Sequence, residues 1–179
     1  MNKESRELPI KVTLFQALPK GDKMETVIQK MIELGAVEIV PVKTSRCIVK
    51  LDDKKASKKV TRWNEIAMSA AKQSKRGIIP TVSDVMTYEQ ALEKAKSMDI
   101  TLFPYEGAED IDHTREIFGK IDKGASIAIF IGPEGGFSVE EVKKAEDASA
   151  QEITLGNRIL RTETAGMMIM SVLMYLFEE

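Results

Sequence analysis

The chain has 179 residues, 43% of them hydrophobic and 30% charged, with a formal net charge of −2 at pH 7. This length suits one domain with a sizeable core, and the composition is that of an ordinary globular protein. Residues 1–11 are too polar for a secretory signal, and no apolar run is long enough to cross a bilayer. We therefore expect a cytoplasmic protein without membrane contact.

The scarcity of cysteine and histidine excludes two further classes. Cys47 is the single cysteine, so no internal disulfide can form, which fits a reducing compartment. His113 is the single histidine and lies in an acidic stretch, so we expect it at the surface. With so few soft ligands, no metal site is expected.

The first 42 residues predict a βαβ unit. Residues 11–17 form the first expected strand, and Asp22 is a candidate N-cap for a helix that begins at Lys23. Apolar residues at helical spacing continue to Gly35, and a second strand follows at 37–42. Two strands connected by a helix in this way are parallel.

A long amphipathic helix is expected from Asp53 to about Lys75. Between residues 54 and 76, eight basic side chains accompany only Glu65, so this segment carries a net charge of +7 and the rest of the chain −9. A basic element on an acidic body indicates a local contact with a polyanion such as RNA; a solvated helix face is the alternative. The residues expected foremost in RNA contact are Arg62, Lys72, Lys75 and Arg76.

The second half of the chain alternates strands and helices. Strands are expected at 80–85, 100–103, 126–131 and 151–155, with helices after Thr87, at 111–118 and at 139–148. Residues 126–131 are apolar throughout, as in a strand buried on both faces of a parallel sheet. Ser138 and Glu141 have the spacing of a capping box. The predicted fold class is α/β, with a mostly parallel sheet flanked by helices.

The last expected helix, from Thr162 to about Phe177, is apolar on nearly every side. Such a helix must be buried all round, and in a chain of this size a partner subunit is a natural cover. We interpret its four methionines as packing residues, with ligand lining as the alternative. This helix therefore predicts a homo-oligomer.

Two glycine-bearing segments each follow an expected strand. Residues 132–136 read Gly-Pro-Glu-Gly-Gly, and residues 155–165 read Leu-Gly-Asn-Arg-Ile-Leu-Arg-Thr-Glu-Thr-Ala. Ligands of open α/β sheets bind at this end of the strands, and glycine permits close backbone approach. Residues 132–136 are neither a Walker loop nor a dinucleotide fingerprint. Together with the strand end at 103–106, the two segments would surround one cofactor from three sides, although a tight turn is an alternative for 132–136.

These segments make the chain resemble the RsmE-type ribosomal RNA uridine N3-methyltransferases of the SPOUT superfamily. The matching stretches are residues 16–25, 33–35, 62–63, 132–138 and 155–165. The resemblance implies an α/β domain with a deep trefoil knot near its C-terminus and homodimerisation through the last helix. It also implies methyl transfer from S-adenosylmethionine to N3 of a uridine in small-subunit (16S) rRNA, either free or in the assembled small ribosomal subunit.

The resemblance further implies a domain division. Members of the family usually carry an N-terminal β-barrel of PUA type, which we do not expect in this chain. Residues 11–179 would then be the SPOUT methyltransferase domain, and residues 1–10 a remnant or linker.

The site implied by the resemblance holds the cofactor largely through backbone. The expected cofactor-binding residues are Leu102, Phe103, Pro104, Tyr105, Ile131, Gly132, Pro133, Gly135, Gly136, Leu155, Gly156, Asn157, Ile159, Leu160, Thr164 and Ala165. Glu134 and Glu163 are candidate general bases. Arg161 is the candidate to stabilise the N3 anion, unless it only pairs with one of these carboxylates.

Because N3 takes part in base pairing, the target uridine should be unpaired or flipped out. Two other functions stay open at this point. One is a related SPOUT methyltransferase that acts on ribose 2′-hydroxyls or on transfer RNA. The other is a non-catalytic dimeric RNA-binding module.

Overall fold

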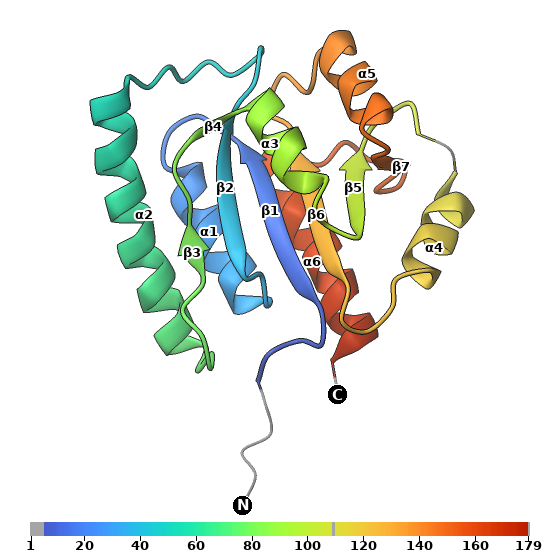
Figure 1. The fold of residues 1–179 in the computed structure, drawn as a ribbon, viewed down its shortest axis with the longest axis horizontal. Helices are drawn as coiled ribbons and strands as arrows, with labels where there is room; N and C mark the ends of the chain where they lie inside the picture. The colour runs from blue at the N-terminus through green and yellow to red at the C-terminus, as the bar shows by residue number, and fades with distance from the viewer. Residues whose placement is uncertain (1–5, 109, 179) are drawn as a thin grey trace, which may run out of the picture.

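One sheet of parallel strands, covered by helices on both faces, makes up the fold (Figure 1). The computed structural model describes residues 6–108 and 110–178. The strands are β1 (Lys11–Ala17), β2 (Glu38–Lys43), β3 (Thr81–Val82), β4 (Met86–Thr87), β5 (Ile100–Pro104), β6 (Ser126–Ile131) and β7 (Gln151–Ile153). The helices are α1 (Lys23–Glu33), α2 (Asp53–Gln73), α3 (Tyr88–Ala95), α4 (Ile111–Gly119), α5 (Val139–Asp147) and α6 (Thr162–Phe177).

The strand order is β3-β2-β1-β6-β5-β7, with β4 also paired to β2. Every pairing between these strands is parallel, which confirms the predicted fold class. From β1 the chain proceeds to β2 and β3 on one side, and β6, β5 and β7 lie on the other. The carboxyl ends of β1 and β6 therefore form a topological switch point, the place where open α/β sheets bind their ligands.

Alternate residues of the central strands enter two separate cores, because successive side chains of a strand point to opposite faces. Leu14 of β1 packs in the core formed with α1, α2, α4 and α6. Phe15 packs in the core formed with α3 and α5. There its ring stacks on Phe130 of β6 with centroids 4.5 Å apart. The sheet is thus buried on both faces, as the apolar run at 126–131 predicted.

The local signals for helix starts are mostly confirmed. Thr87 and Ser138 each form a capping box at the start of α3 and α5. In place of the expected strand at 80–85 there are two short strands, β3 and β4. Each pairs with β2, and the residues between them do not. Asp22 precedes α1, but its side chain makes no cap hydrogen bond.

Residues 6–10 pack on the domain. Ile10 is only 2% exposed and belongs to the core with α1, α2 and α6, and Pro9 O accepts a hydrogen bond from Gly124 N–H at 2.6 Å. Residues 1–5, the rest of the expected linker, lie outside the described residues. No helix in the described part of the chain is long and apolar enough to span a membrane.

Candidate functional site

The three segments predicted to hold a cofactor meet at the carboxyl edge of the sheet, at the top of Figure 1. They follow β5, β6 and β7, which are neighbours in the strand order. Tyr105 N–H donates to Ile153 O at 3.1 Å, so the exits of β5 and β7 stay in register. Thr162 Oγ1 donates to Gly132 O at 2.6 Å and thereby connects the exit of β6 to the start of α6.

The loop at residues 132–136 is held by side chains from both neighbouring connections. Glu134 Oε1 accepts hydrogen bonds from Lys20 N–H at 2.9 Å and from Lys23 Nζ at 3.2 Å. Arg46, in the connection between β2 and α2, donates from Nη1 to Gly135 O at 2.9 Å. The loop is therefore fastened to the β1–α1 connection on one side and to the β2–α2 connection on the other.

The environment of Glu134 keeps its carboxylate ionised. Burial acts to raise its pKa, but the hydrogen bonds from Lys20 N–H and Lys23 Nζ outweigh burial and hold the pKa below its ordinary value. A carboxylate with a lowered pKa is a weak proton acceptor. The geometry accordingly favours an anchoring role for Glu134 over proton abstraction.

Glu163 and Arg161 lie at the start of α6. Glu163 Oε2 is 3.8 Å from Lys23 Nζ, so Lys23 lies between this carboxylate and Glu134. This oxygen is buried and has no hydrogen-bond partner within residues 6–108 and 110–178. Arg161 is exposed, and among the described residues the partner of both Glu134 and Glu163 is Lys23, which disfavours the alternative in which Arg161 only pairs with one of these carboxylates.

The glycines of the two loops leave room beside the backbone. Gly136 has a φ of +69° and Gly156 a φ of +98°, and a Cβ built on either would meet no atom within 4 Å. In the second loop, Ile159 is 87% exposed. Bare backbone and an uncovered aliphatic side chain, both on loops at the carboxyl edge of the sheet, suit the polar and the flat apolar surfaces of a nucleoside cofactor.

Several of the predicted cofactor residues are core residues. Leu102 and Phe103 are fully buried, and Ile131 is 3% exposed. Their side chains pack inside the sheet, so only their backbone could contact a ligand.

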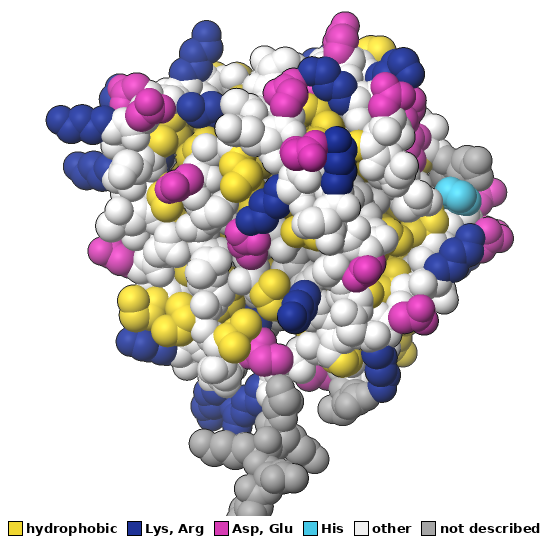
Figure 2. Space-filling model, in the orientation of Figure 1, with side chains coloured by type: hydrophobic (Ala, Val, Ile, Leu, Met, Phe, Trp, Pro, Cys, Tyr) yellow, Lys and Arg dark blue, Asp and Glu magenta, His cyan; other side chains and the backbone are white. Residues whose placement is uncertain are grey.

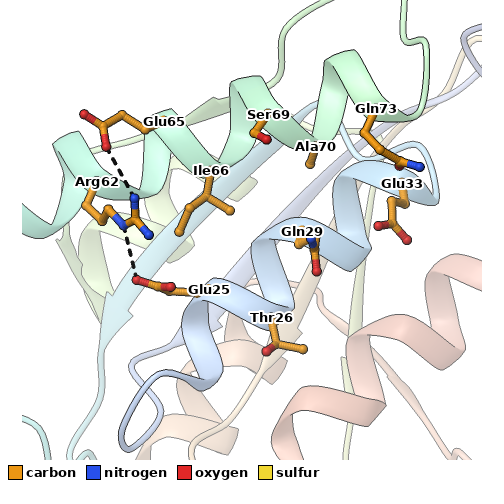
Figure 3. A pocket seen from close by; sticks show the side chains of 10 residues that line it. All are labelled: Glu25, Thr26, Gln29, Glu33, Arg62, Glu65, Ile66, Ser69, Ala70 and Gln73. Carbon is orange, nitrogen blue, oxygen red and sulfur yellow. Dashed lines mark ion pairs between the residues drawn. The ribbon is translucent and has the colours of Figure 1, made fainter.

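A separate groove of about 440 Å³ lies between α1 and α2 (Figure 3). Arg62 lies in it between Glu25 and Glu65, 3.6 Å from each carboxylate. Glu33 lines the groove as well. Two carboxylates already engage the Arg62 guanidinium and Glu33 adds a third negative charge at the other end of the groove, so the groove is unsuited to a phosphate backbone; none of the cofactor loops lines it.

The basic side chains of α2 largely face solvent, and Lys and Arg side chains project from the upper left edge of the molecule over the start of this helix (Figure 2). Lys72 and Lys75 are exposed. Arg76 is not accessible to RNA, contrary to the prediction: its side chain is only 4% exposed and pairs with Glu7. The local charge pattern of the sequence does not reveal that Arg76 is buried, because its partner Glu7 lies 69 positions away.

Two polar residues that sequence reasoning missed are central to this edge. Gln16 is fully buried near the end of β1, and Thr162 is 7% exposed at the start of α6. The signal that could have revealed Gln16 is a long polar side chain near the end of a strand whose residues 12–17 are all buried.

Comparison with known proteins identifies the family. A family model described as RNA methyltransferase domain matches residues 6–174. A protein of Bacillus subtilis named ribosomal RNA small subunit methyltransferase E is 44% identical over 175 residues, which cover 96% of this chain and 68% of the relative. The chain belongs to this methyltransferase family. A second member, from Mesomycoplasma hyopneumoniae, is 36% identical over 169 residues, or 94% of this chain and 71% of the relative.

A solved member of the methyltransferase E family has the same fold. The crystal structure of the Neisseria gonorrhoeae enzyme, bound to S-adenosyl methionine, superposes with a TM-score of 0.86 at 37% identity. The match covers 98% of this chain and 70% of that one. The family resemblance predicted from the two glycine loops is therefore confirmed.

Proposed function

We propose that this protein transfers the methyl group of S-adenosylmethionine to N3 of a uridine in small-subunit rRNA. The observation that carries the proposal is the meeting of three loops at the carboxyl edge of the sheet, one of them leaving β6 at the switch point, in a chain of the methyltransferase E family. The names of the relatives support the small ribosomal subunit as target, and the Neisseria enzyme supports the cofactor. The reaction would take place in the cytoplasm.

The cofactor would lie against the backbone of three segments, namely 102–105, 131–136 and 155–160, with Thr164 and Ala165 nearby. The open space beside Gly136 and Gly156 supports this assignment. When bound, the cofactor supplies a methyl group that is already activated for transfer. The protein must then hold the uridine in line with it and help N3 lose its proton.

Arg161 is the proposed stabiliser of the N3 anion. Its exposed side chain has no carboxylate partner among the ion pairs of the described residues, and it lies next to the N-terminus of α6, whose dipole also favours negative charge. Glu163 is the preferred general base. Glu134 is the weaker candidate, because two hydrogen-bond donors already engage its carboxylate.

RNA would contact the basic face of α2 through Lys72 and Lys75, whereas Arg62, also predicted to bind RNA, is already paired with Glu25 and Glu65. Such contacts go chiefly to phosphate and fix the register of the RNA. A second copy of the chain would cover α6, where Tyr175 is 82% and Leu176 51% exposed. We also propose that the chain carries the deep knot of its superfamily, and that the barrel domain typical of the family is not part of residues 11–179.

The decisive test is methylation with a tritiated donor. Assembled small subunits and free 16S rRNA are each incubated with the protein, and the product nucleoside is identified by mass spectrometry. N3-methyluridine supports the proposal, whereas a 2′-O-methylated nucleoside would establish the related ribose activity. If calorimetry detects no binding of S-adenosylmethionine, a non-catalytic RNA-binding module is the correct interpretation.

A further inference from the structure

A short chain of hydrogen bonds runs beneath the loop at 132–136. The side-chain amide of Gln16 donates from Nε2 to Ala17 O at 3.0 Å and to Thr162 Oγ1 at 2.9 Å. The Thr162 hydroxyl in turn donates to Gly132 O at 2.6 Å. These hydrogen bonds thus connect the end of β1, the start of α6 and the first residue after β6.

The direction of these hydrogen bonds is fixed by chemistry. A backbone carbonyl can only accept, so the single proton of the Thr162 hydroxyl points to Gly132 O. Thr162 Oγ1 must then accept from Gln16, and Ala17 O also requires a donor. Only the nitrogen of the Gln16 amide can satisfy both, so this end of the amide faces Thr162.

The arrangement leaves one polar atom unsatisfied. Gln16 Oε1 is buried and has no hydrogen-bond partner among the described residues. A buried unsatisfied acceptor destabilises the folded state, and an aliphatic side chain at this inward position would avoid that loss. An aliphatic side chain could not donate the two hydrogen bonds that the Gln16 amide makes to Ala17 O and Thr162 Oγ1.

Gly132 has little freedom to move away from Thr162. A Cβ on Gly132 would lie 3.2 Å from the ring of Phe137, so the ring packs closely against this residue. Its carbonyl is bound to Thr162 Oγ1, and the next residue, Pro133, is buried. The orientation of the Gly132 peptide therefore sets the direction in which the loop leaves β6.

We propose that Gln16 and Thr162 are positioning residues that hold the loop at 132–136 in the conformation that binds the cofactor. This inference rests on the proposed function, since it assigns these two side chains to the proposed cofactor site. Neither side chain needs to touch the cofactor or the uridine. Both act through the Gly132 carbonyl.

The test uses substitutions that remove or reverse a hydrogen bond of this series and keep the shape of the side chain nearly unchanged. Thr162→Val keeps the volume and removes the hydroxyl, whereas Thr162→Ser keeps the hydroxyl. Gln16→Glu turns both donors into acceptors, which takes the Thr162 proton away from Gly132. We expect T162V and Q16E to weaken binding of S-adenosylmethionine about tenfold in calorimetry, with T162S within about twofold of the unsubstituted protein.

A matched control separates positioning from general loss of stability. Thr87→Ala removes the capping box of α3, on the opposite face of the sheet, and should lower the midpoint of denaturant unfolding. Its affinity for S-adenosylmethionine should stay unchanged. For T162V, KM for the cofactor should rise while kcat at saturation changes little.

Hydrogen exchange provides a measurement that does not depend on the cofactor. In T162V, the amides of residues 134–136 should exchange faster than in T162S or T87A. A folded T162V with unchanged exchange and unchanged affinity would overturn the inference. If the unsubstituted protein binds no S-adenosylmethionine, the proposed function fails, and the exchange rates still decide whether Thr162 holds the loop.

Discussion

The guanidinium of Arg76 is buried against the carboxylate of Glu7, with Nε 3.0 Å from each carboxylate oxygen. The same guanidinium donates from Nη1 to Ile32 O at 2.7 Å and to Ala36 O at 3.0 Å, and so satisfies carbonyls at the end of α1. Glu7 also accepts from Gly77 N–H at 2.9 Å. One ion pair therefore fastens the segment before β1 to the ends of two helices.

Removal of Arg76 should destabilise the protein strongly. Arg76→Ala takes the charge partner from the Glu7 carboxylate and the guanidinium donor from two carbonyls, and breaking a buried pair in this way costs about 3 kcal/mol or more. Denaturant unfolding monitored by circular dichroism measures the loss. Lys72→Ala, at an exposed position of α2, is the control and should stay within about 0.5 kcal/mol. An equal, small effect for both variants would contradict the structural role of Arg76.

The stability of the protein should fall in acid partly because of Glu7. Burial acts to raise its pKa, but the hydrogen bond and charge of Arg76 outweigh it, and the pKa lies below its ordinary value of 4.5. A carboxyl whose pKa is lowered by folding stabilises the native state above its unfolded-state pKa and loses that contribution as the pH falls through the folded-state pKa. Unfolding free energies measured from pH 7 downward should therefore decline below about 4.5. In Glu7→Gln the decline should be shallower, and an unchanged slope would show that Glu7 is not responsible.

Arg161 should affect the chemical step and leave cofactor binding intact. Arg161→Ala removes the proposed partner of the N3 anion, and loss of one such group lowers kcat about 10²-fold. Affinity for S-adenosylmethionine, measured by calorimetry, should change little. Arg158→Ala is the matched control, because Arg158 is an exposed arginine of the same loop. If R161A and R158A have the same near-normal kcat, Arg161 has no part in the reaction.

Lys72 and Lys75 should contribute to RNA affinity through phosphate. With both replaced by Gln, binding to 16S rRNA should weaken at low salt. The slope of log affinity against log salt concentration should decrease by about one for each phosphate that the protein no longer neutralises. Lys120→Gln, at an exposed position beyond α4, serves as the control and should leave the slope unchanged. A slope unaffected by the double substitution would place the RNA elsewhere on the surface.

The sequence predicted those features that depend on local pattern. The capping residues Thr87 and Ser138, the buried run at 126–131 and the βαβ start all involve neighbours within a few positions. The periodicity of apolar residues and the hydrogen bonds of helix caps both involve residues only a few positions apart in sequence. Parallel pairing was predicted from these, because a helix that connects two strands is the usual crossover between parallel neighbours.

The features that the sequence left open depend on contacts between distant residues. The burial of Arg76 requires Glu7 and the end of α1, and the anchoring of Glu134 requires Lys20 and Lys23. No local rule relates these positions. The candidate site was found in outline because glycine loops mark strand exits, but the roles of its carboxylates became clear only from their donors.

The hydrogen bonds between Gln16, Thr162 and Gly132 have a consequence for biosynthesis. Gln16 and Thr162 are separated by 146 positions, and Thr162 begins the last helix of the fold. A nascent chain that has emerged as far as β7 already contains all seven strands of the sheet but lacks the Thr162 hydroxyl that binds the carbonyl at the β6 exit. On the proposed role of Thr162, the cofactor pocket is complete only after α6 has been translated.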